Sequence, residues 1–283
     1  MFRSLSGHFL SFLAARVEQF HQHQVQSASS SALATPAVSR QVQPSPVAIR
    51  RGIAAGLKFE ADKAHANYIA GTYERPIQNI LEDCLQPGAV FYDIGASLGF
   101  FTLIAAKLVE SSGHVYAFEP VPENAAKIQR HAKLNGFAQV TVLATAVTDT
   151  NGRGELLLAH HAGGATLATV GTPPDYKGHL DVSLASIDHL IANQQLRPPT
   201  VVKVDVEGAE INVLRGMAQT LAAHKPVLIY EIDDGDRTAF QHKNAIVETF
   251  IRQNGYQILP LAKAYATKSW HVSHSLALPI APA

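Results

Sequence analysis

The stretch VFYDIGASLGFFT, residues 90–102, joins a short apolar run, a turn with two glycines and a second apolar segment. An apolar run of this length that ends at a glycine predicts a buried strand, and the residues after Gly99 predict a helix. In an open parallel sheet, ligands bind beyond the carboxyl ends of the strands, where a glycine turn lets the backbone approach them. The next helix points its N–H groups at the same place. We therefore expect this stretch to hold a ligand.

Strands and helices alternate along most of the chain. Strand-like runs occupy residues 89–94, 114–119, 139–147, 200–206, 226–232 and 256–261, and helical patterns occupy 75–85, 99–110, 122–135, 208–223 and 240–254. This order predicts right-handed crossovers and an α/β fold, with a mostly parallel sheet covered by helices on both faces. Residues 152–188 interrupt the rhythm with two further strand-like runs, at 154–158 and 180–184. We expect this insertion to cover the ligand crevice.

The N-terminal part of the chain has a different character. Apolar residues recur at helical spacing over residues 2–20, and residues 27–48 are rich in Ser, Ala, Gln and Pro. These patterns predict an amphipathic helix followed by a flexible linker. We expect an N-terminal segment over residues 1–49 and one domain over residues 50–283. The predicted helix over residues 2–20 carries little positive charge, so we expect at most a weak contact with a membrane or a partner protein.

The composition limits the classes of partner and compartment. An apolar fraction of 47% in 283 residues is ample for a packed core. The 23 basic and 23 acidic residues cancel, so nucleic acid is a disfavoured partner. A single cysteine, Cys84, excludes an internal disulfide and fits a reducing, cytoplasmic setting. No apolar run approaches the ~20 residues of a membrane-spanning helix.

Asp93 lies inside the apolar run, two residues before Gly95. The dinucleotide fingerprint needs G-x-G-x-x-G beneath a pyrophosphate, but this turn lacks the central glycine. A carboxylate beside a pyrophosphate would also cost about 1 to 4 kcal/mol, which disfavours a nucleotide-dependent oxidoreductase. S-adenosylmethionine, which carries an ammonium and a sulfonium, suits the aspartate better. We expect Asp93 to face its amino group, directly or through water; the alternative is that Asp93 only bonds the backbone of the turn.

The ends of the second and third strands supply further candidates for the cofactor site. Glu119 lies 24 positions after Gly95, and an acid there can accept both ribose hydroxyls of an adenosine. Its alternative role is that of an acid favoured at a helix N-terminus. Residues at the end of the third strand are placed to border the adenine, or are turn residues. The predicted cofactor-binding residues are Asp93, Gly95, Ala96, Ser97, Gly99, Glu119, Pro120, Ala146, Val147 and Asp149.

Three motifs together resemble the FkbM-type family of S-adenosylmethionine-dependent methyltransferases. They are Asp93-x-Gly95-Ala96-x-x-Gly99, Phe118-Glu119-Pro120 and Lys203-x-Asp205-x-Glu207-Gly208-Ala209-Glu210. The likeness runs over about residues 73–232, and Ser97 occupies a place where the family often has asparagine. The resemblance implies a Rossmann-like, seven-stranded methyltransferase fold, with O-methylation of a hydroxyl on a small molecule, natural product or sugar. It does not fix the acceptor.

The fourth strand carries the candidate catalytic residues. Methyl transfer to a hydroxyl needs a place for the hydroxyl proton, and Asp205 and Glu207 would project into the crevice near the donor. Lys203 points to the same face as Asp205 and can hold that carboxylate oriented. Glu207 has the alternative role of a helix N-terminal acid. Two carboxylates alone make a poor cage, so we expect no metal. By resemblance, Glu74 and Glu231 can also line the crevice.

Two other functions remain open on the sequence alone. Methyltransferases that act on the amino groups of nucleic acids or proteins often present an Asn/Asp-Pro-Pro-Tyr/Phe turn after the fourth strand. Here that strand runs into Glu207-Gly208, and the similar stretch at residues 173–176 lies in the insertion. A non-catalytic module with the same fold is the other alternative. We predict an enzyme that uses S-adenosylmethionine as its methyl donor.

Overall fold

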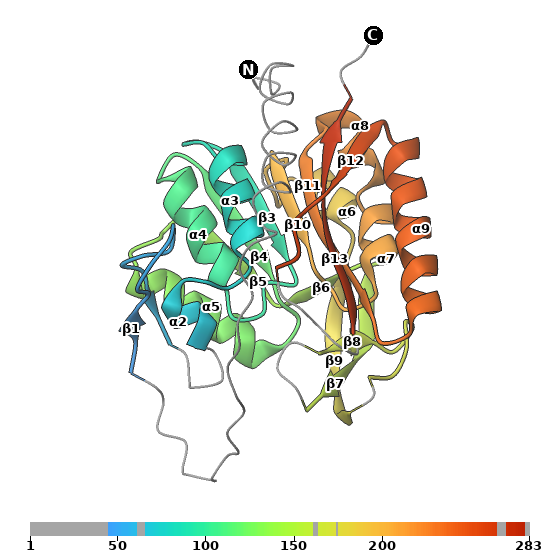
Figure 1. Ribbon diagram of the computed structural model, residues 1–283, viewed down its shortest axis with the longest axis horizontal. Helices are drawn as coiled ribbons and strands as arrows, with labels where there is room; N and C mark the ends of the chain where they lie inside the picture. The colour runs from blue at the N-terminus through green and yellow to red at the C-terminus, as the bar shows by residue number, and fades with distance from the viewer. Residues whose placement is uncertain (1–44, 61–65, 161–163, 174, 265–269, 281–283) are drawn as a thin grey trace.

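The computed structural model describes residues 45–60, 66–160, 164–173, 175–264 and 270–280 (Figure 1). Its centre is a seven-stranded sheet with the strand order β12-β13-β11-β10-β3-β4-β5. The strands are β3 (Val90–Ile94), β4 (His114–Phe118), β5 (Val140–Leu143), β10 (Val201–Val204), β11 (Val227–Asp234), β12 (Tyr256–Pro260) and β13 (His271–Pro279). The pairs from β11 through β5 are parallel, whereas β13 is antiparallel to both of its neighbours. The predicted α/β fold with a seven-stranded, mostly parallel sheet is confirmed.

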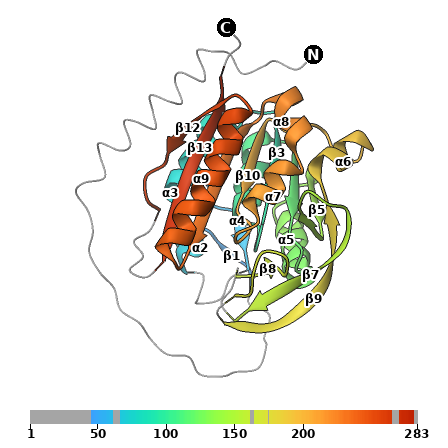
Figure 2. The same ribbon diagram turned by 90° about the vertical axis from the view of Figure 1, so that its right-hand side faces the viewer.

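Helices cover both faces of this sheet (Figures 1 and 2). One face carries α3 (Arg75–Cys84), α4 (Phe100–Val109) and α5 (Pro122–Leu134), and the other carries α6 (Ile187–Ala192), α7 (Glu210–Arg215), α8 (Ala218–His224) and α9 (Arg237–Gln253). The short α2 (Ala66–Ala70) precedes α3. Proline occupies the first turn of both α3 and α5, where its missing N–H leaves no helical bond unmade. Helix α4 is buried nearly all round, which fits its almost entirely apolar sequence.

The two faces of β3 divide the hydrophobic core. Phe91 packs with α3 and α4, whereas Val90, Tyr92 and Ile94 pack with the helices of the opposite face. Successive side chains of a strand point to opposite faces, so Asp93 shares the face of Phe91. All five residues of β3 are buried, which places the Asp93 carboxylate beneath α4.

The single strand predicted over residues 139–147 is wrong. The strand of the large sheet ends before Ala144. The next strand, β6 (Thr145–Val147), does not join the large sheet but pairs with β9 (Tyr176–Ala185). With β7 (Gly152–Ala159) and β8 (Thr166–Leu167), these strands form a separate sheet of order β6-β9-β7-β8. The strands predicted at 154–158 and 180–184 are thereby confirmed. The small sheet lies at the lower end of the large one in Figure 1, near the point where β3, β4 and β10 end.

The single helix predicted over residues 208–223 is also wrong. It is divided into α7 and α8 around Gly216, where a Cβ atom would lie 2.1 Å from the carbonyl oxygen of Thr148. The close approach of the loop after β6 therefore requires glycine at this break. Helix α6 and strand β13 were not predicted.

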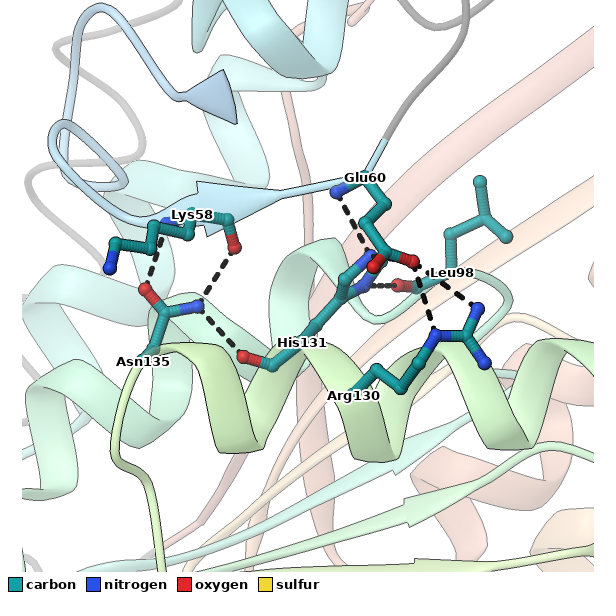
Figure 3. A network of polar contacts seen from close by, with 6 residues as sticks. All are labelled: Lys58, Glu60, Leu98, Arg130, His131 and Asn135. Atoms are coloured by element: carbon teal, nitrogen blue, oxygen red, sulfur yellow. Dashed lines mark hydrogen bonds and ion pairs between the residues drawn. The ribbon is translucent and has the colours of Figure 1, made fainter. Parts of the chain in front are cut away.

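The N-terminal strands β1 (Val47–Ala48) and β2 (Lys58–Phe59) form an antiparallel pair. The Asn135 amide imitates a strand partner, because its Oδ1 accepts the Lys58 N–H and its Nδ2 donates to the Lys58 carbonyl, both at 2.8 Å (Figure 3). The predicted helix at 2–20 lies outside the described residues, as does most of the predicted linker. The division of the chain at residues 49 and 50 stays a prediction. Among the described helices, none has the length and apolarity to cross a bilayer.

Candidate functional site

A cleft of about 650 Å³ opens at the carboxyl ends of the parallel strands, between the large and the small sheet. Its volume suits a small organic ligand. Most of the predicted site residues line it. They are Gly95, Ser97, Glu119, Pro120, Ala146, Val147, Asp205 and Glu207. The topology therefore brings the tips of β3, β4, β6 and β10 to one place, as the positions of these residues in the sequence predicted.

Glu119 fastens two loops of the cleft together. Its Oε2 accepts the Ser97 N–H at 2.8 Å and its Oε1 accepts the Val121 N–H at 2.9 Å. Burial raises the pKa of Glu119 to about 7, although these backbone bonds act in the opposite direction. Each carboxylate oxygen can accept a second hydrogen bond. Glu119 can therefore still receive a pair of hydroxyl groups from the cleft.

The glycines of the turn are required by its surroundings. Gly95 has φ of 82°, and a Cβ atom there would lie 1.7 Å from the carbonyl oxygen of Asp205. Gly99 has φ of 83°, and its Cβ would meet the Ile128 side chain at 3.0 Å. The turn is thus held between the tip of β10 and helix α5. This packing explains why glycine stands at both ends of the turn.

His131 ties the same turn to the N-terminal strands (Figure 3). Its ring Nε2 lies 3.0 Å from the Glu60 backbone N–H, which donates to it, so its Nδ1 carries the proton and donates to the Leu98 carbonyl at 2.9 Å. The side chain is fully buried, and burial lowers its pKa. Arg130 completes the contact with an ion pair to Glu60 at 3.2 Å. A neutral histidine therefore bridges β2 and the glycine turn.

Asp93 lies behind the turn and does not line the cleft. It is 1% exposed, and its Oδ2 accepts the Thr102 hydroxyl at 2.6 Å. Burial raises its pKa above the usual range, while Lys203 acts in the opposite direction. The carboxylate thus joins β3 to the first turn of α4, which is close to the alternative considered for it in the sequence.

Lys203 is the buried cation of the site. Its Nζ lies 2.7 Å from Asp205 Oδ2 and 5.0 Å above the ring of Phe101. Burial alone would lower its pKa, but the carboxylates of Asp205, Asp93 and Glu74 raise it well above the usual range. Lys203 therefore remains an ammonium and orients Asp205, whose side chain is 25% exposed at the cleft.

Glu207 sits where the small sheet meets β10. Its φ is 52°, and its carbonyl accepts the Thr166 hydroxyl of β8 at 2.9 Å. Burial, with the carboxylates of Asp233 and Asp205, raises its pKa to about 9. Glu210 has a different task, because its Oε1 accepts the Gly208 N–H at 2.8 Å. Glu207 therefore keeps its proton at neutral pH in this state, whereas Glu210 shapes the loop.

Some residues lie elsewhere than the sequence predicted. Asp149 does not line the cleft, and its Oδ1 faces Thr148 Oγ1 at 3.2 Å and Asn212 Nδ2 at 3.5 Å. The cleft is also not lined by Ala96, Gly99, Asp93 or Lys203. The lining residues that the sequence reasoning missed include Tyr68, Tyr73, Leu156, Leu158 and Leu180. The leucines belong to the strand-like runs of the insertion, whose alternation was the available signal.

Several known proteins are similar to this chain in sequence. Residues 93–258 match the family model of the methyltransferase FkbM domain. A hexuronic acid methyltransferase, AglP, from Haloferax volcanii is 26% identical over 157 residues, which are 55% of this chain and 61% of that protein. The 31-O-demethyl-FK506 methyltransferase FkbM from Streptomyces tacrolimicus is 25% identical over 178 residues, covering 54% of this chain and 68% of that protein.

A crystal structure of methyltransferase FkbM from Methylobacillus flagellatus KT matches with a TM-score of 0.45 and 17% identity, covering 71% of this chain and 50% of that chain. The family model spans well over half of the present sequence and contains the glycine turn, the Glu119 strand end and the Lys203–Glu210 motif. On this match, the chain belongs to the FkbM family of methyltransferases.

Proposed function

We propose that this protein transfers a methyl group from S-adenosylmethionine to a hydroxyl of a small molecule or a sugar. One observation carries the proposal: Glu119 and Asp205, at the tips of β4 and β10, line one cleft at the carboxyl end of the sheet. The relatives named above act on a hexuronic acid and on 31-O-demethyl-FK506, which supports a hydroxylated acceptor of modest size.

The residues of the cleft fit such a donor. Glu119 retains acceptor capacity for the two ribose hydroxyls, and Ala146 and Val147 offer an apolar border for the adenine. The backbone of the glycine turn is open to the cleft at Gly95 and Ser97. Carboxylates outnumber cations in the wall, which favours a ligand with net positive charge. Asp93 supports the turn from behind, so any contact with the donor's amino group passes through water.

The chemistry assigns separate tasks to the acids of β10. When bound, the donor supplies a methyl group whose bond to sulfur breaks as a bond to the acceptor oxygen forms, and the electron pair stays on sulfur. The acceptor hydroxyl must then lose its proton. Asp205 is held in place by Lys203 and is open to the cleft, so it accepts the hydrogen bond of that hydroxyl and receives the proton. Glu207, which holds its own proton, donates a hydrogen bond that orients the acceptor.

Two measurements test this function. Calorimetry with S-adenosylmethionine and S-adenosylhomocysteine reports donor binding, and a methyl-labelled donor with a panel of uronic acids, other sugars and macrolide alcohols reports transfer. We expect Asp205→Asn to lower the rate of transfer by about 100-fold or more without weakening donor binding, and Glu207→Gln to have a smaller effect. Glu82→Gln, at an exposed position of α3, is the control. A protein that binds neither S-adenosylmethionine nor S-adenosylhomocysteine would refute the proposal and favour a non-catalytic module.

A further inference from the structure

Three side chains from distant parts of the sequence meet beside the cleft. Glu74 precedes α3, Glu231 belongs to β11, and His274 belongs to β13. One ligand atom from each lies within 4.8 Å of the other two. Glu74 Oε2 lies 3.7 Å from His274 Nε2, and the same nitrogen contacts Glu231 Oε2. The three side chains, here called the Glu-Glu-His cluster, are nearly buried, with exposures of 1%, 13% and 5% in that order.

The fold sets this geometry. Glu231 and His274 are directly opposite each other in the antiparallel pair of β11 and β13, so their side chains share one face of the sheet. Glu74 adopts φ of 41° and ψ of 55° at the start of α3. Its neighbour Tyr73 lines the cleft, as does Glu231. The Glu-Glu-His cluster therefore borders the cleft on the side of β11, beyond Asp205.

The Glu74 carboxylate of the cluster has an oxygen that makes no hydrogen bond within the described residues. Glu74 is buried, and its Oε2 has no hydrogen-bond partner among the described residues. The buried ammonium of Lys203 is bonded to Asp205. Buried polar atoms are almost always hydrogen-bonded, and a buried carboxylate needs a cation nearby.

We infer that the Glu-Glu-His cluster binds a divalent transition-metal ion. Two carboxylate oxygens and one imidazole nitrogen suit Mn²⁺, Co²⁺ or Zn²⁺, whereas the nitrogen is a poor ligand for Mg²⁺ or Ca²⁺. Three protein ligands leave coordination positions open, and Glu231 directs them to the cleft. No metal was expected from the sequence, in which the three ligands are far apart; the fold brings them together.

The role of the ion, unlike its binding, rests on the proposed function. An acceptor hydroxyl or carboxylate that reaches the open positions would be held at a fixed distance from Asp205. A metal-bound hydroxyl also loses its proton more easily, which would lower the demand on the carboxylate as a base. An acceptor with two neighbouring oxygen atoms, such as a sugar diol or a hydroxy acid, fits this arrangement best.

Titration with Co²⁺ tests the site directly. The full chain, without a histidine tag and freed of metal by a chelator, is titrated while the visible absorption of Co²⁺ is recorded, and Mn²⁺ binding is followed by electron paramagnetic resonance. We expect one ion per chain. Loss of a second-shell partner commonly weakens metal affinity 10–100-fold, so Glu231→Gln and His274→Gln, which remove ligands, should weaken it by about 100-fold or more.

A matched control comes from the small sheet. His179 Nδ1 and Glu155 Oε1 lie 3.7 Å apart, as in the Glu-Glu-His cluster, but both side chains are exposed and belong to no such cluster among the described residues. His179→Gln and Glu155→Gln should leave Co²⁺ binding unchanged. If His274→Gln proves unfolded by circular dichroism, Glu74→Gln replaces it, because an amide can occupy the same position.

The outcomes separate the two proposals. No binding of Co²⁺ or Mn²⁺, or equal binding by the wild type and Glu231→Gln, overturns the metal site and leaves a metal-free Glu–His–Glu contact. Donor binding is measured in parallel with chelator present. If the metal binds but neither S-adenosylmethionine nor S-adenosylhomocysteine does, the proposed function fails and the metal site stands. If transfer continues at the same rate after chelation, the role in transfer is overturned.

Discussion

Glu119 at the end of β4 accepts the backbone N–H of Ser97 in the turn after β3 at a distance of 2.8 Å. One side chain therefore fixes the spacing between two neighbouring strand tips before any ligand arrives. Its second oxygen holds the Val121 N–H at the start of α5. The residue that we assign to the ribose hydroxyls is thus also part of the structure of the site.

Replacing Glu119 with glutamine should weaken donor binding by about 10–100-fold. The amide keeps one acceptor oxygen, but an NH₂ group replaces the other oxygen. This group cannot accept the hydrogen bonds of a backbone N–H and a ribose hydroxyl. Calorimetry with S-adenosylhomocysteine measures the effect, with Glu82→Gln as the control. Unchanged affinity would remove Glu119 from the donor site.

Donor affinity should rise with pH across neutrality. Burial raises the pKa of Glu119 to about 7, and the ionised carboxylate is the better acceptor for hydroxyls. Binding should therefore strengthen between about pH 6 and about pH 8, by up to about 10-fold per pH unit below the pKa. The same shift means that the folded state holds a proton that the unfolded chain releases near pH 4.5, so this residue's contribution to stability falls as pH rises from about 4.5 to about 7. The affinity of Glu119→Gln should lose this pH dependence; a dependence that persists would assign it to another group.

Gly95→Ala and Gly136→Ala separate steric from backbone effects. Both glycines have positive φ, 82° and 71°, so both alanines carry a backbone penalty of about 1 kcal/mol. Only at Gly95 does the new Cβ meet another atom, the Asp205 carbonyl oxygen at 1.7 Å, whereas nothing lies within 4 Å at Gly136. We expect Gly95→Ala to lower the free energy of unfolding by at least about 2 kcal/mol more than Gly136→Ala, and to abolish donor binding. If urea denaturation showed that both variants lose the same free energy of unfolding, the carboxyl end of β10 would have to move aside for the new Cβ at little cost.

Lys203→Met should be strongly destabilising, because it leaves Asp93 and Asp205 without their cation. Removing one partner of a buried ion pair typically costs about 3 to 5 kcal/mol. The double variant Lys203→Met/Asp205→Asn removes the unbalanced charge next to the lysine and should recover part of the loss. Urea denaturation of both proteins measures the difference. A double variant less stable than Lys203→Met would contradict the assignment of Lys203 as the charge partner of Asp205.

Acidification should loosen the link between β2 and the glycine turn. Burial lowers the pKa of His131. Below about pH 6.5 the unfolded chain therefore binds a proton at this histidine that the folded chain does not bind, and stability falls as pH falls. One such group contributes at most about 1.4 kcal/mol per pH unit. His131→Gln should reduce this slope in denaturation series between about pH 5 and about pH 7. His242→Gln, at an exposed position of α9, should not. A slope equal to the wild type in His131→Gln would place the sensitivity elsewhere.

The parts of the fold that sequence predicted well are those in which local pattern and tertiary contact agree. Strand β3 and helix α4 follow from an apolar run that ends at a glycine. The break at Ala144 has no such signal, because the apolar pattern continues while the chain changes its partner from β4 to β9. The break at Gly216 depends on the Thr148 carbonyl, which is distant in sequence.

The site shows the same division. Glu119 and Asp205 could be placed because they follow strands whose order could be inferred. His274 could not, because β13 contains buried polar residues and lacks a clear alternation, and its position opposite Glu231 exists only after an antiparallel strand enters the sheet. The environment of Asp93 was partly misjudged, since its carboxylate accepts a hydrogen bond from the Thr102 hydroxyl, which lies in the first turn of α4.

The separate pairing of β6 with β9 has a consequence for how such enzymes diversify. Within the part of the chain that the structure describes, no ladder of backbone hydrogen bonds joins the small sheet to the large one. Residues of β7 and β9 can therefore be exchanged or lengthened without disturbing the register of β3, β4 and β10. Selection can therefore reshape the β7 and β9 side of the cleft while the ends of β3, β4 and β10 keep their arrangement.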